Sequence, residues 1–188
     1  MDYSNARKLN IGSGKKNIKD FTNFDGLIWD GNTNIIWNLV DTPYPFEDEH
    51  IEEIVCMEVL EHISWQDTLK VLNEFNRILK LKGKLHIQVP DCGKMMEYYV
   101  NNQICECVPH KDDGNGFKAD PKCINCQGKG KVNPKRWLLA FTGSQKHKFD
   151  IHKNIFTKES LELALMTIGF KHLKFRDDIS KLIVNCIK

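Results

Sequence analysis

The positions of apolar residues predict a series of short strands in the first half of the chain. Leu9 and Ile11 mark a first strand, and residues 21–25 form a second that ends in an acid. The run at 53–57 reads as continuously apolar, which suits a strand buried on both faces of a parallel sheet. Residues 85–89 alternate between apolar and polar side chains as the next strand.

A helix is expected between the last two of these strands. Ser64 is placed to cap it, and Asp67 completes a capping box. The apolar residues that recur at helical spacing, and would face the sheet, are Leu69, Leu72, Phe75 and Leu79. Gly83 is expected to end the helix. Strand, helix and strand together predict a right-handed βαβ unit.

The second half of the chain continues the alternation. A helix is expected over 92–101, and another begins at the N-cap Thr157 and ends at Gly169. The apolar stripe of that last helix is Leu161, Ala164, Leu165 and Ile168. The segments 170–176 and 181–187 then predict a terminal hairpin. The whole pattern is typical of an α/β fold with a mostly parallel sheet and a C-terminal antiparallel hairpin.

Size and composition favour one domain. With 188 residues, 41% of them hydrophobic, the chain can bury one substantial core. We therefore treat 1–188 as a single domain with an insertion at 103–150, a segment rich in Gly, Lys and Cys. No apolar run approaches the roughly 20 residues of a membrane span, and no signal peptide is recognisable. A cytoplasmic protein is expected.

A glycine-rich turn follows the first strand. Gly12-Ser13-Gly14 turns the chain so tightly that backbone N–H groups face outward, and a side chain there would clash with the turn or with a ligand. Asp25 then stands where an acid could hydrogen-bond a ribose. A plain Gly-Ser turn would explain the glycines alone. Because Asn17 occupies the third-glycine position of the NAD fingerprint and Asp25 comes early, the loop favours S-adenosylmethionine over a dinucleotide.

Several separated motifs carry a family resemblance. They are LNIGSG at 9–14, PFEDEHIEEIVCMEVLEHI at 45–63, EFNRILKLKGKL at 74–85, VPD at 89–91, and FT to GF over 156–170. With these motifs the chain resembles the class I S-adenosylmethionine-dependent methyltransferases, and among them the small methyltransferase type 11-like proteins that open with LNLGCG and carry VLEHI downstream. The resemblance implies a Rossmann-like sheet and methyltransferase activity.

The resemblance also implies roles for individual residues. The glycines would lie under the methionine part of the cofactor, and Asp25 would accept hydrogen bonds from the ribose hydroxyls. Asn38-Leu39 stands where the family often has Asp-Leu, so the Asn38 side-chain oxygen would accept the adenine amino group without charge. The candidate cofactor-binding residues are Asn10, Ile11, Gly12, Ser13, Gly14, Asp25, Asn38, Leu39, Met57 and Glu58.

The candidate catalytic residue is His62. Methyl transfer is an in-line displacement from a sulfonium, so an enzyme mainly positions two reactants and, where needed, removes a proton. His62 follows a strand at the start of a helix, where substrate should approach, although it could instead pack or cap there. Asp91 and His152 are further candidates, each of which could instead be a loop residue bonded to backbone.

The inserted segment contains a cysteine cluster. Cys105-x-Cys107 and Cys123-x-x-Cys126 are separated by 15 residues, a pattern that suits a tetrahedral structural zinc. The second pair, continued to Gly130, resembles a cysteine repeat of the J-domain chaperones. The cluster therefore predicts a zinc-knuckle-like module, in which His110 could replace one cysteine. Buried free thiols are the alternative.

Basic residues also gather in the insertion. They are Lys118, Lys122, Lys129, Lys131, Lys135, Arg136, Lys146 and Lys148, with Trp137, Phe141 and Phe149 among them. Such a mixture can bind nucleic acid or another anionic macromolecule, although a solvated lysine-rich loop has the same composition. The net charge of +2 implies no polyanionic partner by itself. We therefore expect a methyltransferase of unknown acceptor; the alternative is a catalytically inactive, zinc-stapled binding module.

Overall fold

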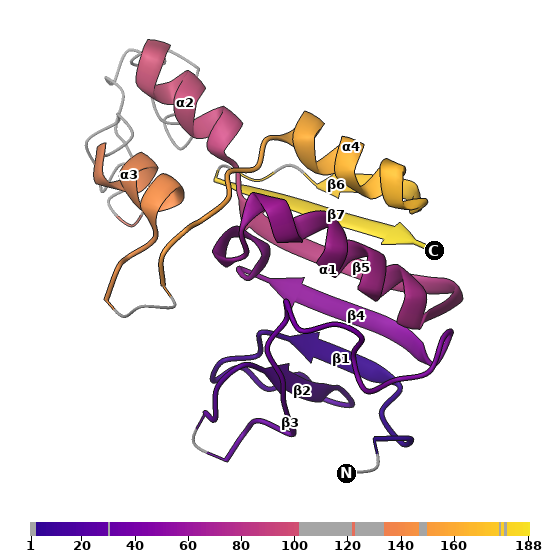
Figure 1. The fold of residues 1–188 in the computed structure, drawn as a ribbon. Helices are drawn as coiled ribbons and strands as arrows, with labels where there is room; N and C mark the ends of the chain where they lie inside the picture. Colours follow the sequence, from indigo (N-terminus) through magenta and orange to yellow (C-terminus); the bar gives the residue numbers. More distant parts are fainter. Residues whose placement is uncertain are drawn as a thin grey trace.

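The computed structural model describes residues 3–29, 31–101, 122, 134–146, 150–176, 178 and 180–188. Within these residues seven strands form one sheet, in the order β3-β2-β1-β4-β5-β7-β6 (Figure 1). The strands are β1 (Lys8–Ile11), β2 (Thr22–Asp25), β3 (Ile35–Ile36), β4 (Ile51–Met57), β5 (Leu79–Pro90), β6 (Lys171–Arg176) and β7 (Lys181–Ile187). β1 to β5 pair in parallel, whereas β7 is antiparallel to β5 and β6. The predicted sheet with its terminal hairpin is thus confirmed.

Helices fill the intervals between the later strands. In the described part of the chain they are η1 (Leu60–His62), a 3-10 helix, and α1 (Trp65–Ile78), α2 (Cys92–Asn101), α3 (Pro134–Thr142) and α4 (Lys158–Ile168). No helix among the described residues is long and apolar enough to cross a membrane. α3 lies inside the inserted segment, where the apolar pattern gave no indication of a helix.

Two helices begin at their predicted caps. The Ser64 hydroxyl accepts a backbone N–H of the first turn of α1 (3.2 Å), but Asp67 does not complete a capping box with it. A reciprocal box occurs at α4 instead. There Thr157 Oγ1 accepts from the Ser160 N–H (3.3 Å), and Ser160 Oγ accepts from the Thr157 N–H (2.9 Å).

α1 is shorter than predicted. It ends at Ile78 rather than at Gly83, because Leu79 already has extended dihedral angles (φ −70°, ψ 137°) and pairs with β4 as the first residue of β5. A register shift in the β4–β5 ladder follows directly. Gly83 belongs to this bulge, where a Cβ atom would lie 2.8 Å from the Lys80 carbonyl oxygen.

The buried stripe of α1 also differs from the prediction. Leu72 and Phe75 are fully buried as expected, but Leu69 is 44% exposed. Val71 and Ile78 are buried instead. The face that meets the sheet is therefore rotated away from Leu69.

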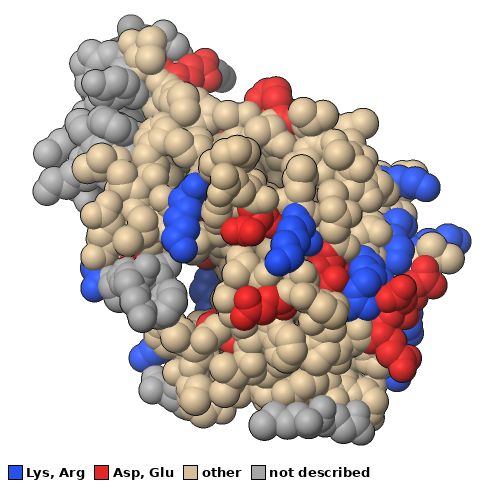
Figure 2. Space-filling view, viewed as in Figure 1, with Lys and Arg blue, Asp and Glu red and all other residues tan. Residues whose placement is uncertain are grey.

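Charged side chains are interspersed over the surface. On the face shown in Figure 2, Lys and Arg lie among Asp and Glu rather than in one basic patch. Several form pairs, such as Lys80 with Glu52 (2.8 Å) and Lys8 with Glu53 (3.1 Å). This arrangement agrees with the small net charge of +2.

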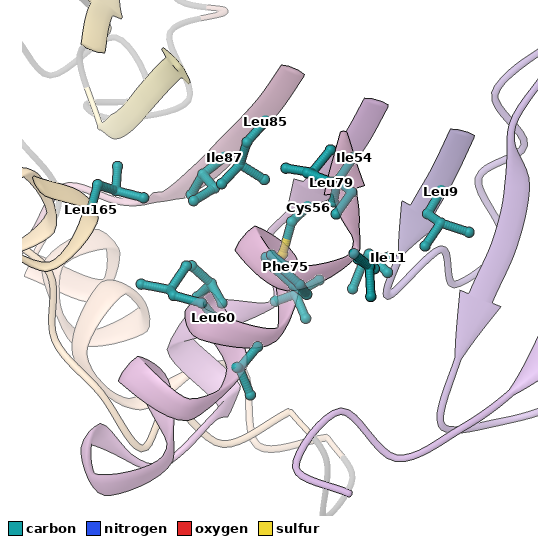
Figure 3. Packing of buried hydrophobic residues seen from close by; sticks show 14 of the residues in the cluster. Leu9, Ile11, Ile54, Cys56, Leu60, Phe75, Leu79, Leu85, Ile87 and Leu165 are labelled. Carbon is teal, nitrogen blue, oxygen red and sulfur yellow. The ribbon is translucent and has the colours of Figure 1, made fainter. Parts of the chain in front are cut away.

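The hydrophobic core lies between the sheet and one layer of helices. α1 and α4 cover the same face (Figure 1), and their side chains Phe75 and Leu165 meet the strand residues Ile54, Cys56 and Ile87 (Figure 3). Burial of such side chains is the main stabilising contribution, at about 1.5–3 kcal/mol each. Because Cys56 is buried and free, it acts here as a small apolar residue.

The opposite face of the central strands is polar. In β4, Ile54 and Cys56 are buried but Val55 and Met57 are only half-buried, and Val55 pairs in register with His86 of β5. The His86 ring contacts Asn185 of β7 (2.8 Å) on that face. The prediction that 53–57 is buried on both sides is wrong, because no helix of the described residues covers the second face.

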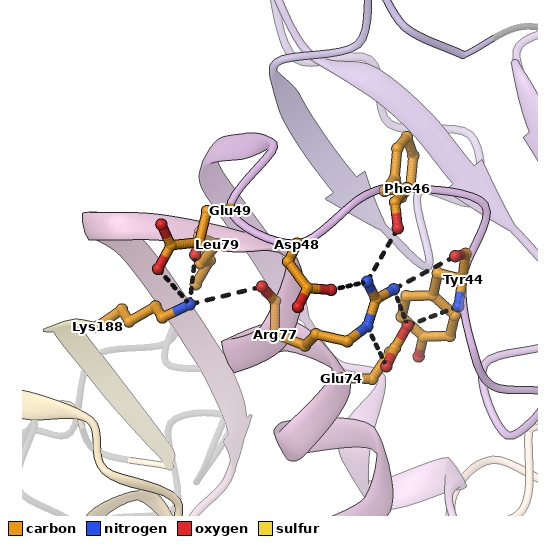
Figure 4. Close-up of polar contacts among 8 residues, drawn as sticks. All are labelled: Tyr44, Phe46, Asp48, Glu49, Glu74, Arg77, Leu79 and Lys188. Atoms are coloured by element: carbon orange, nitrogen blue, oxygen red, sulfur yellow. Dashed lines mark hydrogen bonds and ion pairs between the residues drawn. The ribbon is translucent and has the colours of Figure 1, made fainter.

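Arg77 of α1 fastens the loop that precedes β4 (Figure 4). Its guanidinium donates to both oxygens of Glu74 (3.0 and 2.6 Å) and to Asp48 (2.6 Å). It also donates to the carbonyl oxygens of Phe46 (3.0 Å) and Tyr44 (3.3 Å). Glu74 is buried and accepts the Tyr44 N–H as well (2.6 Å). The Arg77 side chain thus ties helix and loop together.

Candidate functional site

The glycine turn after β1 has two different constraints. Gly12 has φ +60°, and a Cβ atom there would lie 2.3 Å from Cγ2 of Val59. Gly14 has φ +53°, but a Cβ atom would meet nothing within 4 Å. Both positions therefore favour glycine through their backbone conformation, and Gly12 also through packing. The Gly12 N–H donates to the Phe24 carbonyl (2.8 Å), which holds the turn against β2.

Asp25 at the end of β2 holds this turn from the other side. Its Oδ2 accepts the Gly14 N–H and its Oδ1 accepts the Leu27 N–H, both at 2.9 Å. An ionised carboxylate offers about four acceptor sites. Both oxygens therefore keep lone pairs that ribose hydroxyls can use. The observed bonds are compatible with the predicted role of Asp25 in binding the ribose.

A cleft of about 680 Å³ opens at the carboxyl ends of β1, β2 and β4. The predicted site residues that line it are Gly12, Gly14, Asp25, Asn38, Leu39, Glu58 and His62. Its volume lies within the range of about 300–1,000 Å³ typical of small-molecule sites. Its position is the crevice in which open α/β sheets bind ligands.

Four predicted residues lie outside the lining of the cleft: Asn10, Ile11, Ser13 and Met57. Ile11 is part of the core. The Asn10 amide donates to Asn23 Oδ1 (2.9 Å) and to the Lys16 carbonyl (3.0 Å). Because Asn10 is buried and its amide nitrogen donates both of these bonds, its side chain supports the glycine turn from the core side.

Some lining residues were not found from the sequence. Leu27, Trp29 and Val40 flank the predicted residues, whereas Asp150 is the last residue of the insertion and Lys153 follows it. Trp29 Nε1 is buried and has no partner in the described part of the chain. Such an unpaired donor in a cleft fits a polar ligand there. A tryptophan beside the second strand was the available signal; Asp150 and Lys153 gave none.

Glu58 joins the cleft to a second pocket of about 170 Å³. It directly follows β4 with φ +58°, a conformation that costs a non-glycine residue about 1–3 kcal/mol and is common at functional sites. Its carboxylate accepts from Gln88 Nε2 (2.8 Å) and pairs with Lys181 (3.2 Å). The second pocket is also lined by Leu139 and Ala140 of α3, so the insertion contributes one of its walls.

His62 and His152 lie together between the two pockets. His62 lines the cleft and His152 lines the second pocket, and their ring centroids are 4.9 Å apart. Because a carbonyl can only accept, Nδ1 of His62 donates to Ile151 (3.2 Å) and Nδ1 of His152 to Ala140 (2.8 Å). Burial lowers the pKa of His62, which favours the neutral ring with a free Nε2 lone pair.

The neighbouring acids differ in role. Asp91, the other catalytic candidate, lines neither pocket. Its Oδ1 accepts the Lys94 N–H (2.9 Å) at the start of α2, and burial raises its pKa.

Glu61 was not predicted from the sequence as a site residue. Its side chain is 1% exposed, and burial raises its pKa to about 8. Neither of its carboxylate oxygens has a partner among the described residues.

The predicted zinc ligands cannot be placed in this site. Cys105, Cys107, Cys123 and Cys126, and the substitute His110, lie outside the described residues. The three cysteines of the described residues, Cys56, Cys92 and Cys186, are buried and free.

Comparisons of sequence connect part of the chain to a family. Residues 31–87 match a family model described as a methyltransferase domain. The uncharacterized protein MJ0638 of Methanocaldococcus jannaschii is 40% identical over 60 residues, which make up 32% of this chain. The match spans only 25% of that relative's length.

Comparisons of structure concern the fold of the whole chain. A S-adenosylmethionine-dependent methyltransferase from Archaeoglobus fulgidus superposes with a TM-score of 0.57 at 12% identity, covering 99% of this chain and 88% of that one. A 1,6-didemethyltoxoflavin-N1-methyltransferase from Burkholderia thailandensis, solved with 1,6-didemethyltoxoflavin and S-adenosylhomocysteine, gives 0.55 at 12% identity. It covers 97% of this chain and 71% of its own. The sheet is that of the class I methyltransferases.

Proposed function

We propose that this chain is an S-adenosylmethionine-dependent methyltransferase that holds its methyl donor in the 680 Å³ cleft. The observation that carries the proposal is the turn Gly12-Ser13-Gly14, pinned by Asp25 at the crevice of a class I methyltransferase sheet. The family match over 31–87 and the fold point to the same activity. The acceptor is not identified by either.

Three residues that line the cleft support this proposal. Asp25 keeps acceptor lone pairs for the ribose hydroxyls, Asn38 is the candidate acceptor for the adenine amino group, and the Trp29 Nε1–H is an unpaired hydrogen-bond donor. When bound, S-adenosylmethionine supplies an electrophilic methyl group on its sulfonium. Glu58 and His62 border the end of the cleft that meets the second pocket. We place the acceptor in that pocket, with the His62 Nε2 as the candidate base.

The first experiment measures binding. Titration calorimetry with S-adenosylmethionine, S-adenosylhomocysteine and NAD should give heat for the first two only. Asp25→Asn should weaken S-adenosylhomocysteine binding by about 1.5–3 kcal/mol, the range for hydrogen bonds to a charged group. Glu47→Gln is the matched control, because it removes the same charge from an exposed loop position. Unchanged affinity in Asp25→Asn, with the fold intact, would reject the ribose assignment.

The second experiment separates an enzyme from an inactive module. Labelled S-adenosylmethionine is incubated with RNA, protein and small-molecule fractions of a cell extract. Transfer to one fraction, lost on adding excess S-adenosylhomocysteine, is expected. Cofactor binding without transfer to any fraction would favour the inactive binding module.

For the insertion we propose a structural zinc held by Cys105, Cys107, Cys123 and Cys126. The support is the spacing of the two pairs in a segment too polar to build a core. Metal analysis of protein purified without added zinc tests it. Less than about half an equivalent of zinc would contradict a stable structural site of this kind.

We propose a nucleic acid as the acceptor class. The support is the run of basic residues over 118–148, together with the wall that α3 gives to the second pocket. Replacing Lys129, Lys131, Lys135 and Arg136 by Ala should reduce transfer to RNA and its salt dependence. Unchanged transfer would leave the insertion a structural element only.

A further inference from the structure

Glu61 is a buried carboxylate without a partner. Its side chain is 1% exposed, and neither oxygen accepts a hydrogen bond from any described residue. Burying a carboxylate costs several kcal/mol unless a proton, a donor or a cation compensates it. Nothing in the proposed methyl transfer uses this group. Either a proton or a cation held by these oxygens can supply the compensation.

Two imidazole nitrogens lie beside it. One ligand atom each of Glu61, His62 and His152 fall within 4.8 Å of one another. The ligands of one zinc ion lie about 3–3.5 Å apart, given metal–ligand distances of about 2.0–2.2 Å. Side-chain rotations that move the ligand atoms by about 1–2 Å would therefore bring all three within bonding distance of one ion. The set of two histidines and one carboxylate is a common one for divalent transition metals.

Each histidine has one ring nitrogen held by a backbone carbonyl. The Nδ1–H of His62 donates to Ile151 and that of His152 to Ala140, so each ring keeps Nε2 as the free nitrogen. A backbone carbonyl on the other ring nitrogen is the usual support of a metal-bound histidine, because it fixes the tautomer and the ring plane. Backbone hydrogen bonds also hold the segment that carries His152 against Glu61. The Glu61 carbonyl accepts the N–H groups of Lys153 (2.7 Å) and Asn154 (3.1 Å).

We propose that Glu61, His62 and His152 bind a divalent transition-metal ion, such as Zn²⁺, between the cleft and the second pocket. The site is distinct from the four cysteines of the insertion. Three protein ligands leave a coordination position open for water or for an oxygen of the acceptor. With an ion bound, the Nε2 of His62 is a ligand and no longer serves as the candidate base. Of the charged groups that act on Glu61, Glu58 and Asp150 are negative and Lys181 is positive.

Cobalt binding tests the site in the full-length protein, after treatment with a chelator. Co²⁺ bound by nitrogen and oxygen ligands gives weak d–d bands, whereas thiolate ligation adds intense charge-transfer absorption. The two proposed sites are thus distinguished in one spectrum. His152→Ala and Glu61→Gln should each weaken the nitrogen–oxygen component by at least about 100-fold, since even second-shell changes cost 10–100-fold.

The matched control is His86→Ala, which removes a half-buried histidine from the sheet face far from the cluster. It should bind Co²⁺ as the unaltered protein does. The proposal is overturned if His152→Ala binds equally tightly with unchanged thermal unfolding, or if only thiolate bands appear. Should Glu61→Gln fail to fold, His152→Ala decides alone. Because no methyl donor is added, failure of the proposed methyl transfer would leave this result intact.

Discussion

Gly12 and Gly14 occupy similar places in the motif, but the structure constrains them differently. Gly14→Ala should lower the free energy of unfolding by about 1–2 kcal/mol, the cost of a left-handed conformation for a residue with a Cβ atom. Gly12→Ala should cost a further 1–3 kcal/mol or so, because the new methyl group overlaps Val59. Urea denaturation measures both.

A second substitution tests whether contact with Val59 causes the additional loss of stability in Gly12→Ala. Val59→Ala in the Gly12→Ala background should recover part of the additional loss, because it removes the atoms that the new methyl group meets. Equal losses in the two single variants would show that the turn shifts to accommodate the side chain.

Sequence alone could identify those parts of the site that depend on local backbone. The glycines and Asp25 are recognisable because a tight turn after a strand demands them. Asp150 and Lys153 are not, since they lie at the end of the insertion and just after it, far along the chain from the glycine turn. Glu61 is not recognisable either, because only burial distinguishes an unpaired carboxylate from a solvated one.

The contact between α1 and the loop before β4 depends on a half-buried ion pair. Arg77→Ala should lower the free energy of unfolding by about 3 kcal/mol, because it leaves the buried Glu74 without its main partner. Lys80→Ala is the control, since it breaks only a surface pair with Glu52 and should cost less than about 1 kcal/mol.

Thermal or chemical unfolding of both variants gives the comparison. Because the loop also carries Leu39, whose carbonyl accepts the Tyr44 hydroxyl (2.8 Å), Arg77→Ala should weaken cofactor binding as well. A stability loss no greater than that of Lys80→Ala would contradict this account.

The boundaries of the elements show what periodicity can and cannot predict. Helix starts were found where a side chain caps them, at Ser64 and Thr157. The end of α1 was not, because Leu79 is apolar whether it closes a helix or opens a strand. α3 was missed for another reason: its apolar residues at 137–141 form one continuous run without helical spacing, and Leu138 and Leu139 are exposed.

Ligand binding should stabilise the protein as a whole. S-adenosylhomocysteine at 100 times its dissociation constant should add about 2.7 kcal/mol to the free energy of unfolding. For a chain of this size that corresponds to a rise in melting temperature of about 5–10 °C. Differential scanning fluorimetry measures the shift. Asp25→Asn should show a smaller shift at the same concentration, and an equal one would place the ligand elsewhere.

The mostly parallel sheet with its C-terminal antiparallel strands was predicted from the sequence, but the single helical layer was not. An apolar run at 53–57 looks the same whether one or both faces are buried, because Val55 and Met57 tolerate partial exposure. Only the tertiary arrangement reveals that the second face of β4 and β5 is polar.

That polar face has a consequence for how the sequence can drift. In β5, Lys84 and His86 meet solvent or other polar groups, whereas Leu85 and Ile87 are packed on their neighbours. Substitutions at the first pair change little, and those at the second remove buried surface worth several kcal/mol. Among descendants of this gene, variation along the strand should therefore alternate residue by residue, so that the open side of the sheet accumulates change while the side under the helices stays fixed.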